Sequence, residues 1–253
     1  MAHWLIDWLA TGSLVELTLV FLLENLLILA GVIVVGWALT VLFSQRRVAL
    51  LPKPITFFDG AVAIGNVGLN TLTTVAGLML WRMGVITFRT DVGLWALLDT
   101  LVLLMVMDFT MYWLHRLAHT RLLYPLLHRY HHTFDRPRPL TLFALNPAEN
   151  LAYGALWLAV LCVYEASWAG MSLYLVLNVA FGTVGHLGVE PLPARWVGVP
   201  LIGQVAGASF HAQHHQDKEH NFGFYTLVWD RLFGTVRPDY AESFGKIPVG
   251  LES

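Results

Sequence analysis

The sequence predicts an all-α fold, a multi-pass bundle of transmembrane helices, and three observations support this. Hydrophobic residues make up 57% of the 253 residues and charged residues only 13%, whereas a soluble domain carries about 25% charged residues. The mean hydropathy is +0.61. Several apolar stretches also reach the length of roughly 20 residues that a helix needs to cross a bilayer. These properties exclude a disordered chain and argue against an ordinary soluble enzyme.

The apolar stretches define the expected spans within a single integral-membrane domain, 1–253. They are 14–43, 61–88 and 92–114, followed by a hairpin over 151–185. The last stretch is too long for one span, and residues 167–170 offer a place to divide it. The N-terminal residues 1–12 contain two tryptophans and no basic leader, which is typical of an interfacial segment rather than a signal peptide.

The basic residues predict how the bundle is oriented. With alternating spans, 13 of the 15 lysines and arginines lie on one side of the membrane, and only Arg82 and Arg89 lie on the other. Loops rich in lysine and arginine face the cytoplasm. We therefore expect segments 115–150 and 186–253 to form a cytoplasmic helical cap. The net charge of −2 gives no reason to expect a nucleic acid partner.

Histidine is the residue type that points to chemistry. Eight of the 11 histidines lie in three windows of five residues, with the spacings HxxxH, HxxHH and HxxHH. On a helix, residues three and four apart share a face, so each window would direct its imidazoles the same way. The windows are His115 and His119; His128, His131 and His132; and His211, His214 and His215.

The alternating spans bring all three windows to one membrane face, which predicts a shared metal centre. Eight imidazoles exceed the four to six ligands of one metal ion, so two ions are the economical number. His186, at the end of the hairpin, and His220, five residues after His215, raise the candidate ligands to ten. A site at the surface argues against an ion transporter, whose ligands lie near the bilayer midplane.

One polar stripe accompanies these ligands in the third span. Asp108 and Tyr112 precede His115 at helical spacing on an otherwise apolar helix. Charged groups inside a membrane face the protein interior and mark function. Asp108 is a candidate for holding a ligand imidazole, with helix packing as the alternative.

The order of the histidine windows and their flanks resembles the fatty acid hydroxylase superfamily, which includes sterol desaturases, sterol methyl oxidases and sphingolipid hydroxylases. Residues 108–119 resemble its first motif, DFTMYWLHRLAH, and residues 214–235 resemble its C-terminal signature. The segment His186-Leu-Gly-Val-Glu190 resembles the extra histidine after the last span. One departure is Asn146, which stands where many relatives carry a histidine, three residues before Glu149.

The resemblance implies two non-haem iron ions held by the ten histidines, with Asp108, Tyr112 and Glu190 in supporting or catalytic roles. Zinc remains an alternative that a purified sample can contain, because the histidines themselves do not separate the two metals. The implied reaction is oxygen-dependent hydroxylation of an unactivated C–H bond in a lipid substrate drawn from the bilayer. Desaturation and methyl oxidation would use the same ligands.

Electrons would have to come from a separate protein. The chain has no glycine-rich dinucleotide motif and no haem-attachment motif, and its single cysteine, Cys162, cannot ligate an iron–sulfur cluster. A ferredoxin, a rubredoxin or a cytochrome b5 with an NAD(P)H reductase is the implied donor. Two other classes stay open: a metal-dependent intramembrane hydrolase, which needs no oxygen, and a metal-binding structural or sensor protein.

Overall fold

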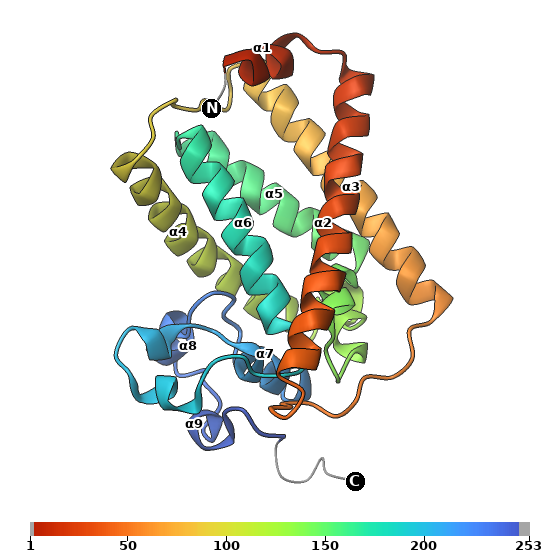
Figure 1. Ribbon diagram of the computed structural model, residues 1–253, viewed down its shortest axis with the longest axis vertical. Helices are drawn as coiled ribbons and strands as arrows, with labels where there is room; N and C mark the ends of the chain where they lie inside the picture. Colours follow the sequence, from red (N-terminus) through yellow and green to blue (C-terminus); the bar gives the residue numbers. More distant parts are fainter. Residues whose placement is uncertain (1–2, 248–253) are drawn as a thin grey trace.

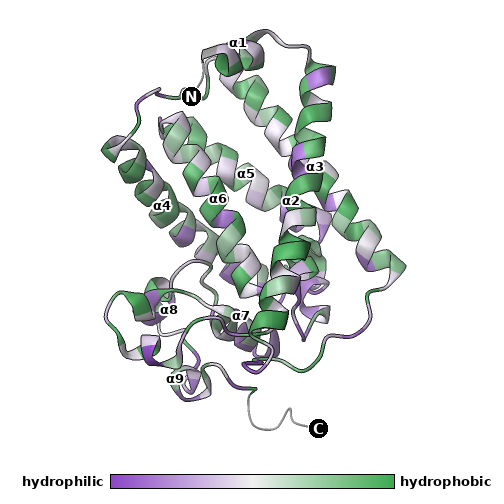
Figure 2. Ribbon diagram, in the orientation of Figure 1, coloured by the Kyte–Doolittle hydropathy of each residue, from purple (hydrophilic) through white to green (hydrophobic). Residues whose placement is uncertain are grey.

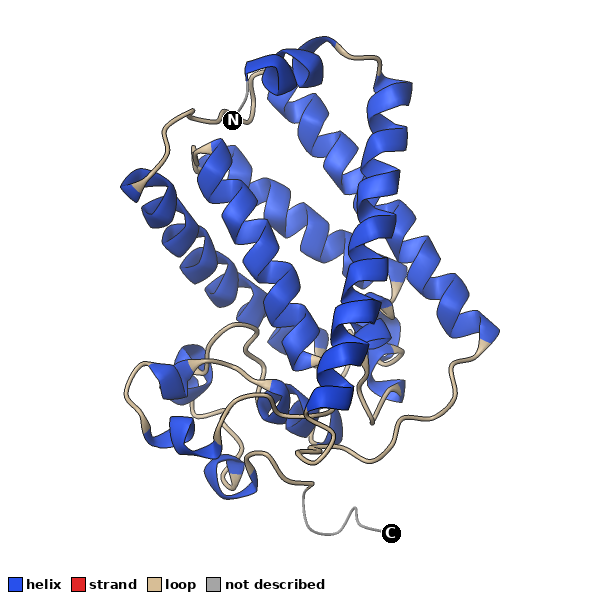
Figure 3. Cartoon of the chain, in the orientation of Figure 1, coloured by secondary structure: helices blue, strands red, loops and turns tan. Residues whose placement is uncertain are grey.

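Figure 1 shows the computed structural model, which describes residues 3–247. Over that range the chain is helical and contains isolated β-bridges but no strand (Figure 3), so the predicted all-α class is confirmed. The long helices are α2 (Leu14–Leu42), α3 (Phe57–Arg82), α4 (Leu94–Ala118), α5 (Pro147–Val163) and α6 (Trp168–Gly185). The short ones are α1 (His3–Thr11), α7 (Ala208–Gln216), α8 (Val228–Phe233) and α9 (Tyr240–Ser243).

Four of these helices, α2, α3, α4 and α6, are long and apolar enough to cross a membrane. Figure 2 shows how much of their length is hydrophobic. Large apolar side chains also point outward from them: Leu27 and Trp37 on α2 are 63% and 66% exposed. Such a surface is stable in lipid but not in water, so the chain is an integral membrane protein.

The observed helix ends differ from the predicted spans because capping residues, not hydropathy alone, set them. The second span runs over 57–82 instead of 61–88. Its start is fixed by a capping box, in which the side chains of Thr56 and Asp59 each bond the other's backbone N–H. Its end is followed by Gly84 at a positive φ of 73°, a conformation that stops a helix.

The predicted hairpin is two helices, α5 and α6, that run antiparallel. The Ser167 side chain accepts a hydrogen bond from the Gly170 N–H and so caps the start of α6. This is the place where the sequence was expected to divide the stretch. With 17 residues, α5 is shorter than the four helices that can span a membrane, and it packs against α3 and α4. Figure 1 shows α5 and α6 side by side.

Short and irregular segments form the cap at one end of the bundle. They include the π-turn η1 (Tyr124–His128) and the 3-10 segments η2 (His131–Thr133), η3 (Pro139–Phe143), η4 (Ala194–Gly198) and η5 (Ile202–Gln204). The buried Asn66 of α3 holds the η3 region, donating to the carbonyls of Phe143 and Leu145 at 2.9 and 2.8 Å. Pro139 packs against α2 at Gly36, where a Cβ would lie 2.4 Å from the proline ring.

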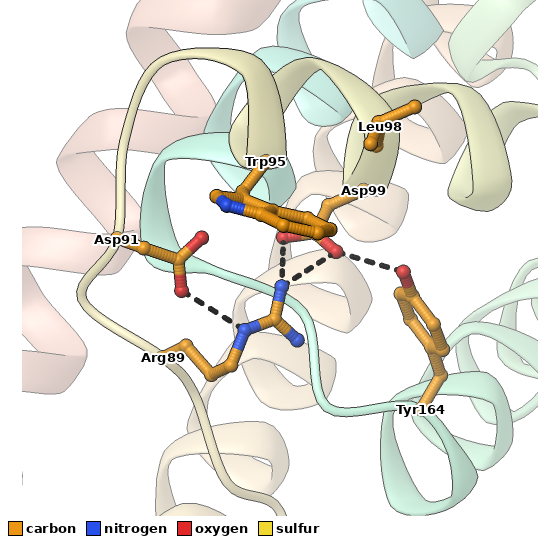
Figure 4. A pocket seen from close by; sticks show the side chains of 6 residues that line it. All are labelled: Arg89, Asp91, Trp95, Leu98, Asp99 and Tyr164. Carbon is orange, nitrogen blue, oxygen red and sulfur yellow. Dashed lines mark hydrogen bonds and ion pairs between the residues drawn. The ribbon is translucent and has the colours of Figure 1, made fainter.

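A polar cluster fastens the opposite end of the bundle, where Arg89, Asp99 and Tyr164 line an open pocket of about 500 Å³ (Figure 4). Asp99, at the start of α4, accepts hydrogen bonds from the Arg89 guanidinium, the Tyr164 hydroxyl and the Ser167 N–H. Arg89 also pairs with Asp91. These contacts tie the α3–α4 loop to the α5–α6 turn, so the pocket belongs to a structural clamp.

Candidate metal centre

Nine buried or half-buried histidines converge where the bundle meets the cap, in two adjoining groups. Within each group, one nitrogen from every ring lies within 4.8 Å of the others. The five-histidine group is His115, His119, His128, His132 and His214. The four-histidine group is His131, His186, His211 and His215.

Each HxxHH window divides its rings between the two groups. His128 and His132, four residues apart, belong to the five-histidine group, while His131 belongs to the four-histidine group. The last window is the reverse: His211 and His215 join the four-histidine group and His214 joins the other. On α7, residues i and i+4 of the last window lie nearly one above the other and residue i+3 lies to one side. The spacing therefore serves two adjacent sites.

Two of the windows lie on α-helices and the middle one does not. The first window ends α4, with His119 at its C-cap, and the third lies on α7. The middle window is not α-helical as its spacing suggested, because His128 ends the π-turn η1 and His131 begins the 3-10 segment η2. The wider π-turn changes the direction of the chain just before these ligands, which π-turns do at functional sites.

The two remaining candidate histidines have different positions. His186 caps α6, and its Nε2 lies 3.0 Å from the Nε2 of His211, so the end of the hairpin reaches the four-histidine group. The structure does not bring the ring of His220 to either group. Its Nδ1 pairs with the Asp217 carboxylate at 2.8 Å, and its backbone carbonyl accepts from His214.

Most of the clustered rings are oriented by a bond at Nδ1. Backbone carbonyls accept from this nitrogen in four of them, at 2.7 to 3.3 Å: Phe222 for His115, Ala144 for His131, Gly182 for His186 and His220 for His214. A hydrogen bond there fixes the tautomer and leaves the Nε2 lone pair free for a metal. With His128, whose Nδ1 faces Glu149, five of the nine rings are held in this way and form a preorganised set of nitrogen donors.

The contacts between rings fit a bound cation. His115 donates its Nδ1–H to Phe222, and His128 directs its Nδ1 to the Glu149 carboxylate at 2.5 Å. When Glu149 is ionised and accepts from His128, both Nε2 atoms carry lone pairs, and they face each other at 3.0 Å. Two lone pairs at that distance repel unless a cation lies beside them. The donor set thus matches a metal that binds imidazole.

The protonation of the cluster favours metal binding as well. Burial, together with the neighbouring histidines, lowers the pKa of His119 to about 2, and burial lowers that of His186 to about 4. The pKa values of His131, His211 and His215 fall well below the usual range for the same reasons. Neutral imidazoles are the form that ligates metals, so protons do not compete for this site near neutral pH.

The carboxylates predicted to support the site hold loops and not rings. Asp108, which is buried, accepts from the backbone N–H groups of Tyr225 and Thr226 at 2.8 and 3.3 Å. Glu190 accepts from the N–H groups of Leu192 and Ser209 at 3.0 and 2.8 Å, and so anchors the start of α7. Burial raises the pKa of Glu190. These carboxylates act on the metal centre through the backbone.

Tyr112 has a similar supporting position. Its hydroxyl lies 3.0 Å from the Thr235 hydroxyl and accepts from Arg116 at 3.2 Å. The ring stacks on Phe233. Tyr112 therefore joins α4 to the end of segment 214–235, through Phe233 and Thr235.

Two acidic residues have contacts with the histidine groups that the sequence did not clearly predict. Glu149 is the one carboxylate among the described residues that pairs with a clustered ring, and only its spacing after Asn146 marked it. Asp230 accepts from the N–H groups of Phe222 and Gly223 at 2.8 Å, which orients the carbonyl that His115 uses. Burial raises the pKa of Asp230 to about 6. Asn146 itself is the N-cap of α5, bonding the Ala148 N–H at 2.9 Å.

Fold and site together define a class: a polytopic α-helical membrane protein with a histidine-lined centre that has room for two metal ions at one end of its bundle. Comparison with protein families makes this specific. Residues 100–235, more than half of the chain, match the fatty acid hydroxylase family, and the chain belongs to that family. The match covers α4 to α8 and includes all nine clustered histidines.

Curated relatives share part of this chain. It is 30% identical over 144 residues to a probable Delta(7)-sterol 5(6)-desaturase of Neurospora crassa, covering 56% of this chain and 39% of the relative. It is 27% identical over 176 residues to human lathosterol oxidase, covering 66% of this chain and 56% of the relative. A very-long-chain aldehyde decarbonylase of Arabidopsis thaliana is 27% identical over 176 residues. The match covers 67% of this chain and 27% of that relative.

The matched part therefore spans about a quarter to just over half the length of these relatives. No solved structure matches the chain.

Proposed function

We propose that this protein is a membrane-bound di-iron oxygenase that hydroxylates an unactivated C–H bond of a lipid. The observation that carries the proposal is the convergence of nine neutral imidazoles in two adjoining groups at the end of an apolar bundle. The apolar bundle lies in the same medium as a lipid substrate, and family membership supports an oxidative reaction.

The number of donors supports iron over zinc. Structural zinc sites are tetrahedral, and catalytic zinc has three protein ligands. A group of five imidazoles exceeds both and suits a metal of higher coordination number. When bound, iron supplies activation of O2, a chemistry that zinc lacks.

In this reaction one oxygen atom enters the C–H bond and the other leaves as water. Two electrons and two protons complete the balance, and a separate redox protein has to supply the electrons. The protein residues hold the ligands in place: Glu149 orients His128, and Asp108 and Glu190 fix the loops behind the rings. Burial of the cluster keeps bulk water away from the oxidising centre.

Desaturation is a second candidate, favoured by the names of two relatives, a sterol desaturase and a lathosterol oxidase. It would use the same oxidant and electrons, but both oxygen atoms would leave as water. A metal-dependent hydrolase fits less well, because neither histidine group includes the carboxylate that commonly bridges a hydrolytic metal pair.

We place the metal centre on the cytoplasmic side. The up-and-down helices put Arg46, Arg47 and Lys53 at the histidine end and Arg82 at the other, as the positive-inside rule requires for that orientation. A ferredoxin, rubredoxin or cytochrome b5 with its NAD(P)H reductase would then reach the centre from the cytoplasm.

The test is untargeted lipid mass spectrometry of cells with and without the protein, combined with oxygen uptake by the purified enzyme supplied with a reduced ferredoxin and a lipid extract of those cells. Hydroxylation adds one oxygen atom to a lipid, and desaturation removes two hydrogen atoms. Both signals should vanish in His128→Ala and His214→Ala. No lipid change and no oxygen uptake in the iron-loaded wild type would refute the oxidative function.

A further inference from the structure

The membrane interior of this protein contains a polar residue that the metal centre does not use. Asn178 lies partway along α6, a largely apolar helix. Its side chain is half-buried. The neighbouring residue on that face, Tyr174, is buried. An amide at this depth has no bulk water to bond, so its hydrogen bonds have to be found within the protein or in a ligand.

A chain of hydrogen bonds fixes this amide by its oxygen. The Tyr225 hydroxyl donates to Asn178 Oδ1 at 2.6 Å. The Tyr174 and Tyr225 hydroxyls lie 3.0 Å apart, so Tyr174 donates and Tyr225 accepts. Both tyrosines are buried, which makes the arrangement rigid. The orientation of the carboxamide is thereby set from one side.

The other half of the amide is unused. No hydrogen bond joins Asn178 Nδ2 to any acceptor in the described range, 3–247. Two N–H groups are therefore available, held in one direction by the bond at the oxygen. Leaving a donor without an acceptor in an apolar environment is costly, and a protein retains one where a ligand supplies the acceptor.

The same loop joins this amide to the metal centre. Residues 222–226 contain Tyr225 and also Phe222, whose carbonyl orients His115. The Phe224 ring lies 5.2 Å from that of His115, and the Phe181 ring lies 5.1 Å from that of Tyr225. These ring contacts lie between the residues that hold the amide and a clustered histidine, and Asn178 precedes His186 by eight residues, about 12 Å along the helix.

We propose that Asn178 is a substrate-positioning residue whose amide N–H groups bind a hydroxyl or carbonyl oxygen of the lipid. This inference rests on the proposed lipid oxidation. It restricts the substrate class to lipids that carry such an oxygen acceptor.

The experiment compares lipids that differ only in that oxygen. Full-length, iron-loaded protein in phosphatidylcholine nanodiscs, supplied with O2 and a reduced ferredoxin as electron donor, receives lathosterol with its 3-deoxy analogue, or octadecanol with octadecane. The wild type should prefer the oxygen-bearing member of at least one pair by about 10- to 100-fold, the effect of one unpaired donor. Asn178→Leu should lower that preference to near one while keeping turnover of the deoxy lipid.

Two further variants separate positioning from a structural role. Tyr225→Phe removes the hydroxyl that orients the amide and should reduce the preference only in part. Asn25→Leu is the matched control, because the Asn25 amide already donates to the Phe21 carbonyl at 2.8 Å within α2. It should leave the preference unchanged.

A binding measurement keeps the inference testable without turnover. The ratio of the two lipids retained by anaerobic, solubilised protein should favour the oxygen-bearing member in the wild type and not in Asn178→Leu. An equal ratio in both proteins would overturn the role of Asn178 and indicate that water satisfies the amide. Retention that depends on Asn178, with no oxidised product from any lipid, would instead refute the proposed function alone.

Discussion

At the scale of residues, the metal centre depends on whether a histidine contributes a ring nitrogen or its backbone carbonyl. Nine rings present one nitrogen each to a group, and His220 takes part through its backbone carbonyl instead of its ring. The distinction arises because the loop after α7 turns the His220 ring toward Asp217. A backbone carbonyl survives substitution, whereas a ligand ring does not.

This difference gives a direct prediction. His220→Ala should retain the iron content of the wild type, because the carbonyl that orients His214 remains. His214→Ala should lose at least one iron atom per chain, because it removes a donor from the five-histidine group. Metal analysis of the two purified variants measures this. Equal iron loss in both would place the His220 ring among the ligands.

Protonation of the same rings predicts how the metal-free protein responds to acid. The pKa of His186 falls from 6.5 to about 4 on folding, so between these values the unfolded chain binds a proton that the folded chain excludes. Stability is therefore full above about pH 6.5 and decreases as the pH falls toward about 4. The melting temperature of the metal-free protein in detergent should drop over that interval. A constant or rising value would contradict the neutral cluster.

At the scale of elements, close packing of the cap against the bundle holds the site. Gly36 of α2 lies against Pro139, the first residue of η3, and Ala144 directly after η3 supplies the carbonyl for His131. Gly31, five residues earlier on the same helix, has no neighbour within 4 Å of an added Cβ. The two glycines form a matched pair on one helix.

Gly36→Ala should destabilise the protein by about 1–3 kcal/mol, because the methyl group overlaps the proline ring. Gly31→Ala should be neutral or slightly stabilising, since alanine is the better helix former. Thermal unfolding of the two variants in the same detergent provides the comparison. Equal changes in stability for the two variants would mean that α2 does not pack closely against η3 at Gly36.

The sequence indicated these elements to different degrees. Hydropathy located the spans, since lipid exposure requires continuous apolar surface, and Ser167 marked the division of the hairpin. The π-turn that ends at His128 was not predictable, because its shape depends on tertiary contacts of the ligands. Asn178 had a signal, a single amide in an apolar helix, but its meaning required the position of Tyr225, 47 residues away.

At the scale of the whole molecule, the orientation in the membrane decides where the redox partner must be. In a Cys162→Ser background, Glu165→Cys lies at the α5–α6 turn and Glu219→Cys lies in the cap, and both positions are exposed. An impermeant maleimide added to intact cells should label the first variant, and the second only after lysis. Labelling in the opposite order would place the metal centre outside the cytoplasm.

The central claim is that distant parts of the chain, from α4 to α7, converge to bind two metal ions at the membrane face. The most direct measurement is the iron content of folded protein reconstituted anaerobically with ferrous iron, with X-ray absorption to identify the ligands. The account predicts two iron atoms per chain in nitrogen-rich coordination. A folded chain that binds one iron atom or none, or iron surrounded mainly by oxygen, would contradict it.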